Sequence, residues 1–273
     1  QGKISSAKLA KCHRLWYNNY VMSRIDEILE KLNEEQIKPV LQTEGAVLVL
    51  AGAGSGKTTV IIHKIEHLIK YGTAYNSDNI PSFVTDADTE IMSWYLNGEL
   101  DELPPHLEDA LCENPLAPWQ ILAITFTNKA AGELKNRLKA KLGESALEIA
   151  AGTFHSSCVK FLRRDIDKLG FEKSFTIYDT ADQQTVIKNC LKELALDDKK
   201  YAPRAVLSII SNAKDSLLSP VEFTKINAND FYLSKVAEIY SLYQRKLKSN
   251  NALDFDDLIV KTVELFEENP DVL

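Results

Sequence analysis

The sequence predicts an α/β protein in which a parallel sheet flanked by helices is combined with an all-helical segment. Up to His155, short apolar runs alternate with segments whose apolar residues recur at helical spacing, which is the pattern of a parallel sheet with crossover helices. Past His155 the apolar runs mostly stop and helical spacing remains. The chain has 273 residues, of which 45% are hydrophobic, so it can bury a sizeable core in one or two domains.

The first 21 residues contain four basic residues and no acidic residue. Either they form a basic, aromatic-rich helix with Leu15, Trp16 and Tyr20, or residues 1–21 are a leader or an added segment before a start at Met22. From Ser23 a helix is expected, because apolar residues recur at helical spacing. These residues are Ile25, Ile28, Leu29 and Leu32.

The segment Ala51–Thr59 reads AGAGSGKTT and fits the phosphate-loop pattern, a small residue, four residues of any type, then Gly, Lys and Ser or Thr. The apolar run Ala46–Leu50 before the loop is predicted to be a strand, and the segment after it has the apolar spacing of a helix. Glycines let such a loop curl so that several N–H groups point into one concavity. The dipole of the following helix adds positive potential there.

Lys57 would bring a mobile charge to the β- and γ-phosphates of a nucleoside triphosphate, and the Thr58 hydroxyl is placed to ligate Mg²⁺. We therefore predict Lys57 and Thr58 as the catalytic side chains, with Thr58 as the metal ligand. The predicted nucleotide-binding residues of the loop are Ala51, Gly52, Ala53, Gly54, Ser55, Gly56, Lys57, Thr58 and Thr59. The alternative interpretation is a glycine-rich turn with no ligand.

Residues 71–118 contain ten acidic residues, five of the nine prolines, and no Lys or Arg. They are predicted to be a partly ordered acidic insertion, with a helix at Thr89–Leu96 that carries Trp94. Such a stretch would repel DNA phosphates, so we expect a solvated excursion or a surface for a basic protein partner. Outside the insertion the charge is close to neutral, so bulk charge gives no support for nucleic-acid binding.

After the insertion, strands are predicted at Ile121–Thr125 and at about Leu147–Ala151. Between them, Asn128 is expected to cap a helix. The apolar face of that helix contains Ala130, Ala131, Leu134 and Leu138.

In the helical segment, Thr180 and Gln183 are predicted to form the capping box of one helix. Pro203 is expected to open a second helix and Asp230 to cap a third. A final helix begins in the motif DFDDLI, Asp254–Ile259. Its apolar face is predicted to contain Phe255, Leu258, Ile259, Val263 and Phe266.

The cysteines show no C-x-x-C pairing and are predicted to be reduced cytosolic thiols, with neither a disulfide framework nor a zinc site. They are Cys12, Cys112, Cys158 and Cys190. No apolar run approaches the ~20 residues of a membrane span. No secretory signal pattern opens the sequence. We therefore expect a cytoplasmic protein with no membrane partner.

The phosphate loop is followed, in order, by TFTNKAA at Thr125–Ala131, GTFHS at Gly152–Ser156 and DFDDLI at Asp254–Ile259. This ordered set resembles the superfamily 1 DNA helicases of the UvrD/Rep/PcrA type, over about residues 22–70 and 119–273. The resemblance implies a P-loop NTPase (RecA-like) motor domain over 22–157, interrupted by the insertion. It also implies an inserted, 1B-like helical subdomain over 158–251 and a helix over 252–273 that returns to the motor domain.

The family resemblance also implies a reaction and its cofactors. ATP hydrolysis with Mg²⁺ would drive 3′-to-5′ translocation on single-stranded DNA and unwinding at junctions of single and double strands. Gln36 resembles the glutamine that reads the adenine edge. Two motifs resemble segments that face single-stranded DNA, and their residues are Phe126, Asn128, Lys129, Thr153, Phe154 and His155.

An aromatic face that stacks bases without reading them suits a motor that moves along one strand. From the residues alone, Phe126 could instead be a core residue, and His155 a helix cap or core histidine. The chain departs from the family at Thr59, Lys64 and Gly132, where relatives often have Arg, so nucleotide and strand contacts can differ in detail.

The family's Walker B Asp-Glu pair and its second motor domain have no counterpart in this sequence. We therefore expect an amino-terminal part of a longer helicase, which binds ATP but does not hydrolyse it alone. One alternative is another P-loop enzyme such as a nucleotide kinase, which would need an acceptor site and lid arginines. Another is a non-catalytic nucleotide- or DNA-binding module.

Overall fold

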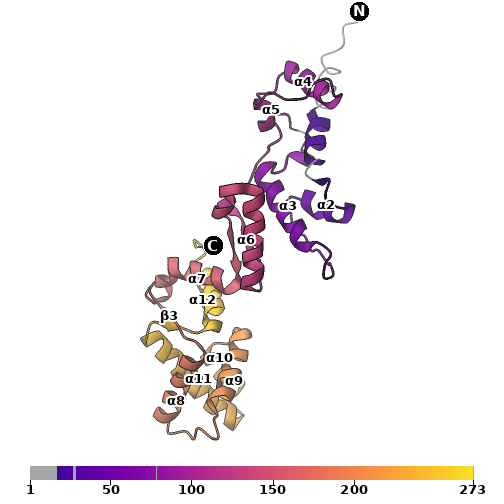
Figure 1. Cartoon of the computed structure of the whole chain (residues 1–273). Coiled ribbons are helices and arrows are strands. Elements are labelled where there is room, and N and C mark those ends of the chain that lie inside the picture. The colour runs from indigo at the N-terminus through magenta and orange to yellow at the C-terminus, as the bar shows by residue number, and fades with distance from the viewer. Residues whose placement is uncertain (1–16, 27–28, 78, 273) are drawn as a thin grey trace, which may run out of the picture. The chain divides into compact units, whose positions relative to one another are not determined.

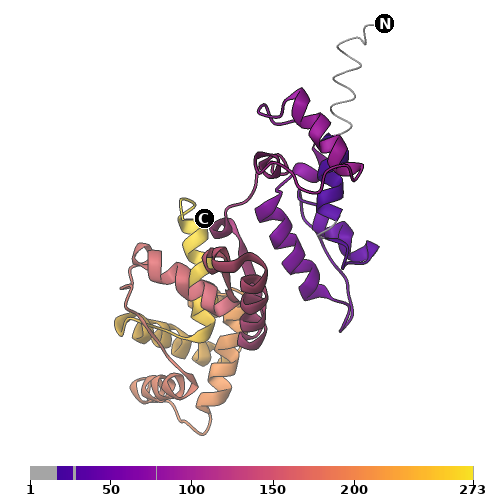
Figure 2. The same ribbon diagram turned by 45° about the horizontal axis from the view of Figure 1, so that its top comes forward.

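The computed structural model describes residues 17–26, 29–77 and 79–272 (Figure 1, Figure 2). Two compact units make up the chain. The first contains residues up to Ala123 together with Thr127–Ala151, and the second contains Ile124–Phe126 and the residues from Gly152 onward. Most of the regular structure is helical, and the described strands form two small sheets. None of the described helices is long and apolar enough to cross a membrane.

In the first unit, α2 (Glu34–Leu41) and α3 (Lys57–Lys70) flank the phosphate loop. The predicted strand at Ala46–Leu50 is wrong: this segment is extended, and none of the described strands pairs with it. Because a strand is held by hydrogen bonds to a neighbouring strand, an apolar run without a neighbour does not form one. Leu48 and Leu50 are accordingly 83% and 87% exposed.

Residues 17–21, for which the sequence leaves a helix and a leader open, begin a helix over residues 17–26. Tyr17 and Tyr20 are buried in the core of the first unit. The Tyr17 hydroxyl donates to the carbonyl of Ala110 at 2.7 Å. The spacing of Tyr17, Tyr20 and Val21 continues into Ile25, so one apolar face runs through the expected start at Met22. Residues 1–16, including Leu15 and Trp16, lie outside the described residues.

The acidic insertion contains η1 (Ala74–Asn76), α4 (Asp86–Leu96) and α5 (His106–Asp109). The helix predicted at Thr89–Leu96 is confirmed as part of α4. It begins three residues earlier, because Thr85 caps it in a capping box with Asp88. The insertion is more than a solvated excursion, since it contributes buried side chains to the core that holds the helix at residues 17–26. These are Ala74, Met92, Leu107, Ala110 and Leu111.

The two ends of the insertion are joined at Gly72 and Glu113. Gly72 has φ 58°, and the Thr73 N–H donates to the carbonyl of Glu113 at 2.8 Å. A Cβ atom at Gly72 would lie 2.0 Å from that carbonyl oxygen, so the close approach requires glycine. The insertion is therefore a closed segment with a fixed base.

After η2 (Pro118–Gln120), β1 (Leu122–Thr125) confirms the second predicted strand. Its neighbour β2 (Ala150–Thr153) begins three residues and ends two residues later than predicted, because η3 (Gly143–Glu148) takes up the start of that segment.

Between these strands, α6 (Asn128–Leu142) is capped by Thr127, so the prediction of Asn128 as the cap is wrong. Thr127 has an extended backbone, and its hydroxyl accepts from the N–H of Ala130 at 3.1 Å, which leaves Asn128 as the first helical residue. The predicted apolar face is buried at Ala131, Leu134 and Leu138, whereas Ala130 is exposed.

The second unit is mainly helical and contains one parallel strand pair, β3 (Thr176–Ile177) with β4 (Ala252–Leu253). Figure 1 shows α8 to α11 gathered in one bundle. The helices are α7 (Phe154–Asp165), η4 (Ile166–Leu169), α8 (Thr180–Glu193), α9 (Pro203–Asp215), α10 (Pro220–Ile226), α11 (Phe231–Ser249) and α12 (Phe255–Glu268). Pro203 opens α9 and Asp230 caps α11, as the sequence predicts.

The capping box predicted from Thr180 and Gln183 is wrong by one residue, because Asp179 is a better cap. Its carboxylate accepts from the N–H groups of Ala181 at 2.7 Å and Asp182 at 2.9 Å. The face of α12 also differs from the prediction. Phe255 and Ile259 are 49% and 40% exposed, while Asp257 and Thr262 are buried.

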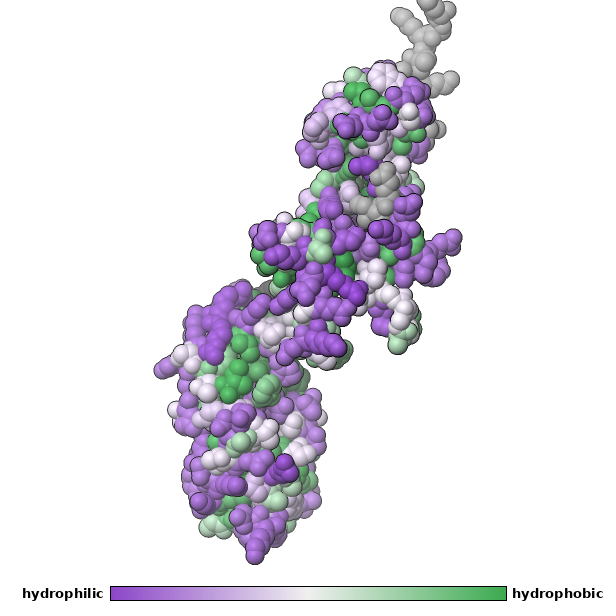
Figure 3. All heavy atoms as spheres, in the orientation of Figure 1, coloured by the Kyte–Doolittle hydropathy of each residue, from purple (hydrophilic) through white to green (hydrophobic). Residues whose placement is uncertain are grey.

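Two cores stabilise the second unit. One is formed by α8, α9, α10 and α11, and the other by α7 and α12 with the segment that leads to β3. In Figure 3 the surface over this unit is mostly hydrophilic with hydrophobic patches. The exposed apolar side chains of the unit include Phe154, Phe255 and Ile259.

His67 on α3 is fully buried, and neither of its ring nitrogens has a hydrogen-bond partner among the described residues. Burial, with a smaller contribution from Lys64, lowers the pKa of His67 from its ordinary 6.5 to about 4. Burial in the first unit therefore favours the neutral imidazole at this position.

We expect this histidine to make the first unit sensitive to acid. Since the folded pKa lies below the unfolded one, the stabilisation is complete above pH 6.5 and is lost as the pH falls toward 4. His67 alone should lower the free energy of unfolding by about 1 kcal/mol between pH 7 and pH 5.5. Denaturant unfolding at both pH values should show a smaller acid loss for His67→Leu than for the wild type. Equal losses would contradict the assignment.

Candidate functional site

The phosphate loop of the first unit turns through two glycines with left-handed backbone, Gly54 with φ 78° and Gly56 with φ 85°. The left-handed backbone favours glycine at both positions, and a Cβ atom at Gly56 would also displace the Nε2 atom of Gln36, which lies 2.5 Å from its place. The helix α3 begins immediately after Gly56, at Lys57. The loop is therefore followed by the positive end of a helix dipole, as the sequence predicts.

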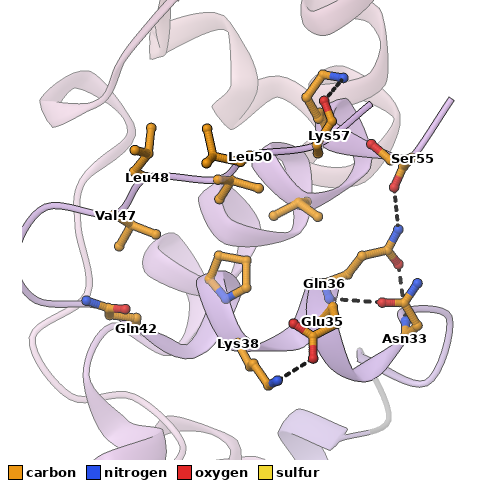
Figure 4. A pocket seen from close by; sticks show the side chains of 14 residues that line it. Asn33, Glu35, Gln36, Lys38, Gln42, Val47, Leu48, Leu50, Ser55 and Lys57 are labelled. Atoms are coloured by element: carbon orange, nitrogen blue, oxygen red, sulfur yellow. Dashed lines mark hydrogen bonds and ion pairs between the residues drawn. The ribbon is translucent and has the colours of Figure 1, made fainter. Parts of the chain in front are cut away.

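Lys57 folds back over its own loop. Its ammonium group donates to the carbonyl of Ala51 at 3.0 Å (Figure 4). It also donates to the carbonyl of Gly52 at 2.6 Å. The Ser55 hydroxyl also donates to the carbonyl of Gly52, at 2.8 Å. A single positive charge thus lies at the loop, where it can exchange two neutral carbonyls for charged phosphate oxygens.

The exposed Thr58 follows Lys57 in the first turn of α3. No cluster of three or more His, Cys, Asp or Glu side chains with metal-binding geometry occurs among the described residues. The one hydroxyl of Thr58 fits Mg²⁺ in a nucleotide complex, because Mg²⁺ takes few protein ligands and completes its shell with phosphate oxygens and water.

Gln36 joins α2 to the phosphate loop. Its Nε2 atom donates to the carbonyl of Ser55 at 3.0 Å, and its Oε1 atom accepts from the N–H of Asn33 at 3.1 Å. Gln36 and Lys57 both line a pocket of about 500 Å³ (Figure 4). The other lining residues are Asn33, Glu35, Lys38, Pro39, Gln42, Val47, Leu48, Val49, Leu50, Ala51, Ser55 and Val60. The structure therefore brings Gln36 and Lys57 to one cavity, although 20 positions separate them in the sequence.

The second group of predicted residues includes two neighbouring phenylalanines of the second unit. Phe126, after β1, is 91% exposed, and Phe154, at the start of α7, is 46% exposed. Their ring centroids are 5.7 Å apart with a tilt of 49°. Phe126 is thus not a core residue, and the alternative that it belongs to the core is wrong.

His155 is half-buried, and its ring meets that of Phe255 edge to face at 5.6 Å between centroids. Sequence reasoning placed Phe255 on the buried face of its helix and missed this contact. The position directly after the cap Asp254 could have indicated exposure, because the first residue of a helix often lies outside the packed stripe. We call these four side chains the aromatic row: Phe126, Phe154, His155 and Phe255.

The other predicted DNA-facing residues, Thr153, Asn128 and Lys129, do not belong to the aromatic row. Thr153 is the cap of α7, and its hydroxyl accepts from the N–H of Ser156 at 3.3 Å. Asn128 and Lys129 are exposed in the first turn of α6, which belongs to the first unit. Thr153 is therefore a structural cap in this chain, because its backbone N–H also donates to the Ser156 hydroxyl at 2.8 Å and its carbonyl accepts from that hydroxyl at 2.9 Å.

Comparison with known proteins decides the family. The profile of the UvrD/REP helicase N-terminal domain matches residues 32–90 and 108–273. The chain belongs to this family. The predicted resemblance to helicases of the UvrD/Rep/PcrA type is confirmed. The phosphate loop, Gln36 and the aromatic row all lie inside the part of this UvrD/REP domain that matches, whereas residues 91–107 of the acidic insertion lie outside it.

Several curated relatives of this UvrD/REP domain are named ATP-dependent DNA helicase PcrA. The protein from Bacillus subtilis (strain 168) is 42% identical over 255 residues, which cover 93% of this chain and 28% of the relative. The protein from Staphylococcus aureus (strain Mu50) is 41% identical over 249 residues, which cover 91% of this chain and 28% of the relative. The chain thus spans about 28% of the length of these relatives.

Proposed function

We propose that this chain is the ATP-binding, amino-terminal part of an ATP-dependent DNA helicase. The observation that carries the proposal is the ammonium of Lys57 on the carbonyls of Ala51 and Gly52, in a loop that opens α3 of a UvrD/REP domain. ATP hydrolysis in the whole protein would drive 3′-to-5′ translocation on single-stranded DNA and unwinding at junctions with double strands. Such a function implies a cytoplasmic location.

The nucleotide site in this proposal has the RecA-like arrangement of a P-loop NTPase. The N–H groups of the loop and Lys57 hold the β- and γ-phosphates, and the Thr58 hydroxyl ligates Mg²⁺. When bound, Mg²⁺ neutralises phosphate charge. Gln36 faces the adenine, and it must exchange the Ser55 carbonyl for the base, because its amide already has partners in the chain.

Single-stranded DNA is proposed to stack on the aromatic row. In the row, the ring centroids of Phe126 and Phe154 are 5.7 Å apart, and those of His155 and Phe255 are 5.6 Å apart. The rings offer π-faces to the bases, and only His155 also has ring nitrogens that can hydrogen-bond to base edges. Such a surface binds bases of any type, which suits a motor that moves along a strand of arbitrary sequence. Asn128 and Lys129, exposed at the start of α6, are proposed to contact phosphates.

Replacing Phe126 with alanine should weaken binding of single-stranded DNA by about 5- to 150-fold, since stacking one base on an aromatic ring contributes ~1–3 kcal/mol. Fluorescence anisotropy of a labelled oligo(dT) at fixed salt measures this loss. Phe231→Ala is the matched control, because Phe231 is also exposed, at 70%, and lies in the same unit outside the row. Equal losses in the two variants, or no loss for Phe126→Ala, would contradict DNA stacking at the row.

The acidic insertion is proposed to stay off the DNA backbone and to face a basic protein partner. Its Trp94 is 46% exposed on α4, among acidic neighbours with no Lys or Arg in residues 71–118. Photo-crosslinking from position 94 should therefore give no DNA adduct, because like charges repel phosphates over about one Debye length. The same crosslinker at position 126 is the positive control. A DNA adduct from position 94 comparable to that control would overturn this assignment.

A further inference from the structure

The second unit contains a buried charged cluster that nucleotide and DNA binding do not explain. Lys214 of α9, Asp254 before α12 and Asp257 in α12 have side chains 1%, 2% and 1% exposed. The ammonium of Lys214 lies 2.6 Å from the Oδ2 atom of Asp254 and 2.7 Å from the Oδ1 atom of Asp257. Charged side chains this deeply buried are rare, and they need partners.

The two carboxylates form the first turn of α12. Asp254 caps the helix by accepting from the N–H of Asp257 at 2.8 Å, and Asp257 accepts in return from the N–H of Asp254 at 3.4 Å. This capping box places two acidic groups side by side away from water, where they repel each other. Lys214 is therefore the group that makes the turn electrostatically possible.

Two side chains of α11 complete the cluster. The Tyr243 hydroxyl donates to the Oδ2 atom of Asp254 at 2.9 Å, and the Gln244 Nε2 atom donates to the Oδ1 atom of Asp257 at 3.0 Å. Although burial disfavours its charge, the two carboxylates hold the pKa of Lys214 above its ordinary value. Burial raises the pKa of Asp257. The first turn of α12 is thus fixed to α9 and α11 through one ammonium and two donors.

Phe255 lies in this turn, between the two carboxylates. Its ring is 49% exposed and contacts the ring of His155 in α7 edge to face. The helices α7 and α12 share the core residues Leu162, Leu258 and Leu265, which hold the body of α12, whereas the buried cluster holds its first turn. The direction of the Phe255 ring therefore depends on the cluster beneath it.

We propose that Lys214 is a positioning residue that holds Phe255 against His155 for stacking of single-stranded DNA. The inference rests on the proposed DNA contact of the aromatic row. Lys214 does not touch DNA itself, and it acts through the backbone of Asp254–Asp257. Loss of its charge should turn Phe255 away from the row and leave two carboxylates without compensation.

The test is a double-mutant cycle in the full protein, with oligo(dT) affinity measured by anisotropy at fixed salt. Phe255→Ala should weaken binding by about 5- to 150-fold, as expected for loss of a stacking ring. Lys214→Met should weaken it at least about fivefold alone, but less than about twofold when Phe255 is already alanine, because coupled residues are not additive. Lys246→Met is the control, since Lys246 is paired with Glu193 at the surface of the same unit, and it should change nothing.

The double-mutant cycle distinguishes failure of the DNA contact at Phe255 from failure of the positioning role of Lys214. If Phe255→Ala leaves affinity unchanged, the DNA contact at this ring is wrong, and the positioning role fails with it. If Phe255→Ala weakens binding but folded Lys214→Met does not, or if the two losses add, Lys214 is not a positioning residue. Should Lys214→Met fail to fold by circular dichroism, Tyr243→Phe takes its place. This milder variant removes one donor to Asp254 and should show a smaller loss with the same dependence on Phe255, and an additive loss would overturn the proposal.

Discussion

Replacing Lys57 with alanine is expected to weaken ATP binding by at least about 30-fold, or ~2 kcal/mol, which is a typical cost of losing a hydrogen bond to a charged group. In the free protein the ammonium lies on the carbonyls of Ala51 and Gly52, at 3.0 Å and 2.6 Å. A bound triphosphate offers charged oxygens in place of these neutral ones, so the lysine contributes more to the complex than to the empty loop. In the variant the N–H groups of the loop should still bind phosphate, but the loop lacks the positive charge of Lys57.

Titration of a fluorescent ATP analogue measures the loss, and Lys139→Ala provides the control. Lys139 lies in the same unit and is paired with the exposed Glu144, away from the phosphate loop. Its removal should leave nucleotide affinity unchanged. Superimposable titration curves for Lys57→Ala and the wild type would show that AGAGSGKTT is a glycine-rich turn with no nucleotide, and the proposed function would lose its main support.

Features set by local sequence could be predicted well. The phosphate loop, its helix and the caps at Pro203 and Asp230 depend on residues within a few positions of one another, so their patterns are visible in the chain. The errors at Asn128 and Thr180 are of one residue, because two adjacent polar residues competed for each cap. In both cases the residue with the extended backbone, Thr127 or Asp179, took the position.

Features set by distant residues could not be predicted. The strand expected at Ala46–Leu50 needs a neighbouring strand, which the apolar pattern of a single segment does not specify. The burial of Tyr17 depends on Leu107 and Ala110, which the acidic composition of the insertion conceals. Phe255 is exposed on α12 instead of buried, while Asp257 is buried beside Lys214 of α9.

The lining of the pocket at the phosphate loop also bears on whether residues 1–273 hydrolyse the nucleotide that we propose they bind. Its lining residues in the described part of the chain include one carboxylate, Glu35, and no arginine. Glu35 is already paired with Lys38. Hydrolysis requires a group that holds the attacking water in line and positive charge on the developing transition state. In the proposed site Lys57 and Thr58 would bind the phosphates, but neither of them would orient water.

We therefore expect residues 1–273 to bind ATP and to release phosphate at a rate near background, with or without single-stranded DNA. An arginine finger alone contributes roughly 10³–10⁵ in rate in phosphoryl transfer, about 4–7 kcal/mol, so a pocket whose described lining has no arginine should fall at least that far below a helicase pocket that has one. A phosphate-release assay beside Bacillus subtilis PcrA measures the difference, and titration of the same sample with a fluorescent ATP analogue shows that the site is folded. Turnover comparable to that relative, abolished by Lys57→Ala, would mean that this chain itself contains the catalytic carboxylate. In that case Glu35 would be the first candidate, and Glu35→Gln would have to remove the activity while leaving nucleotide affinity intact.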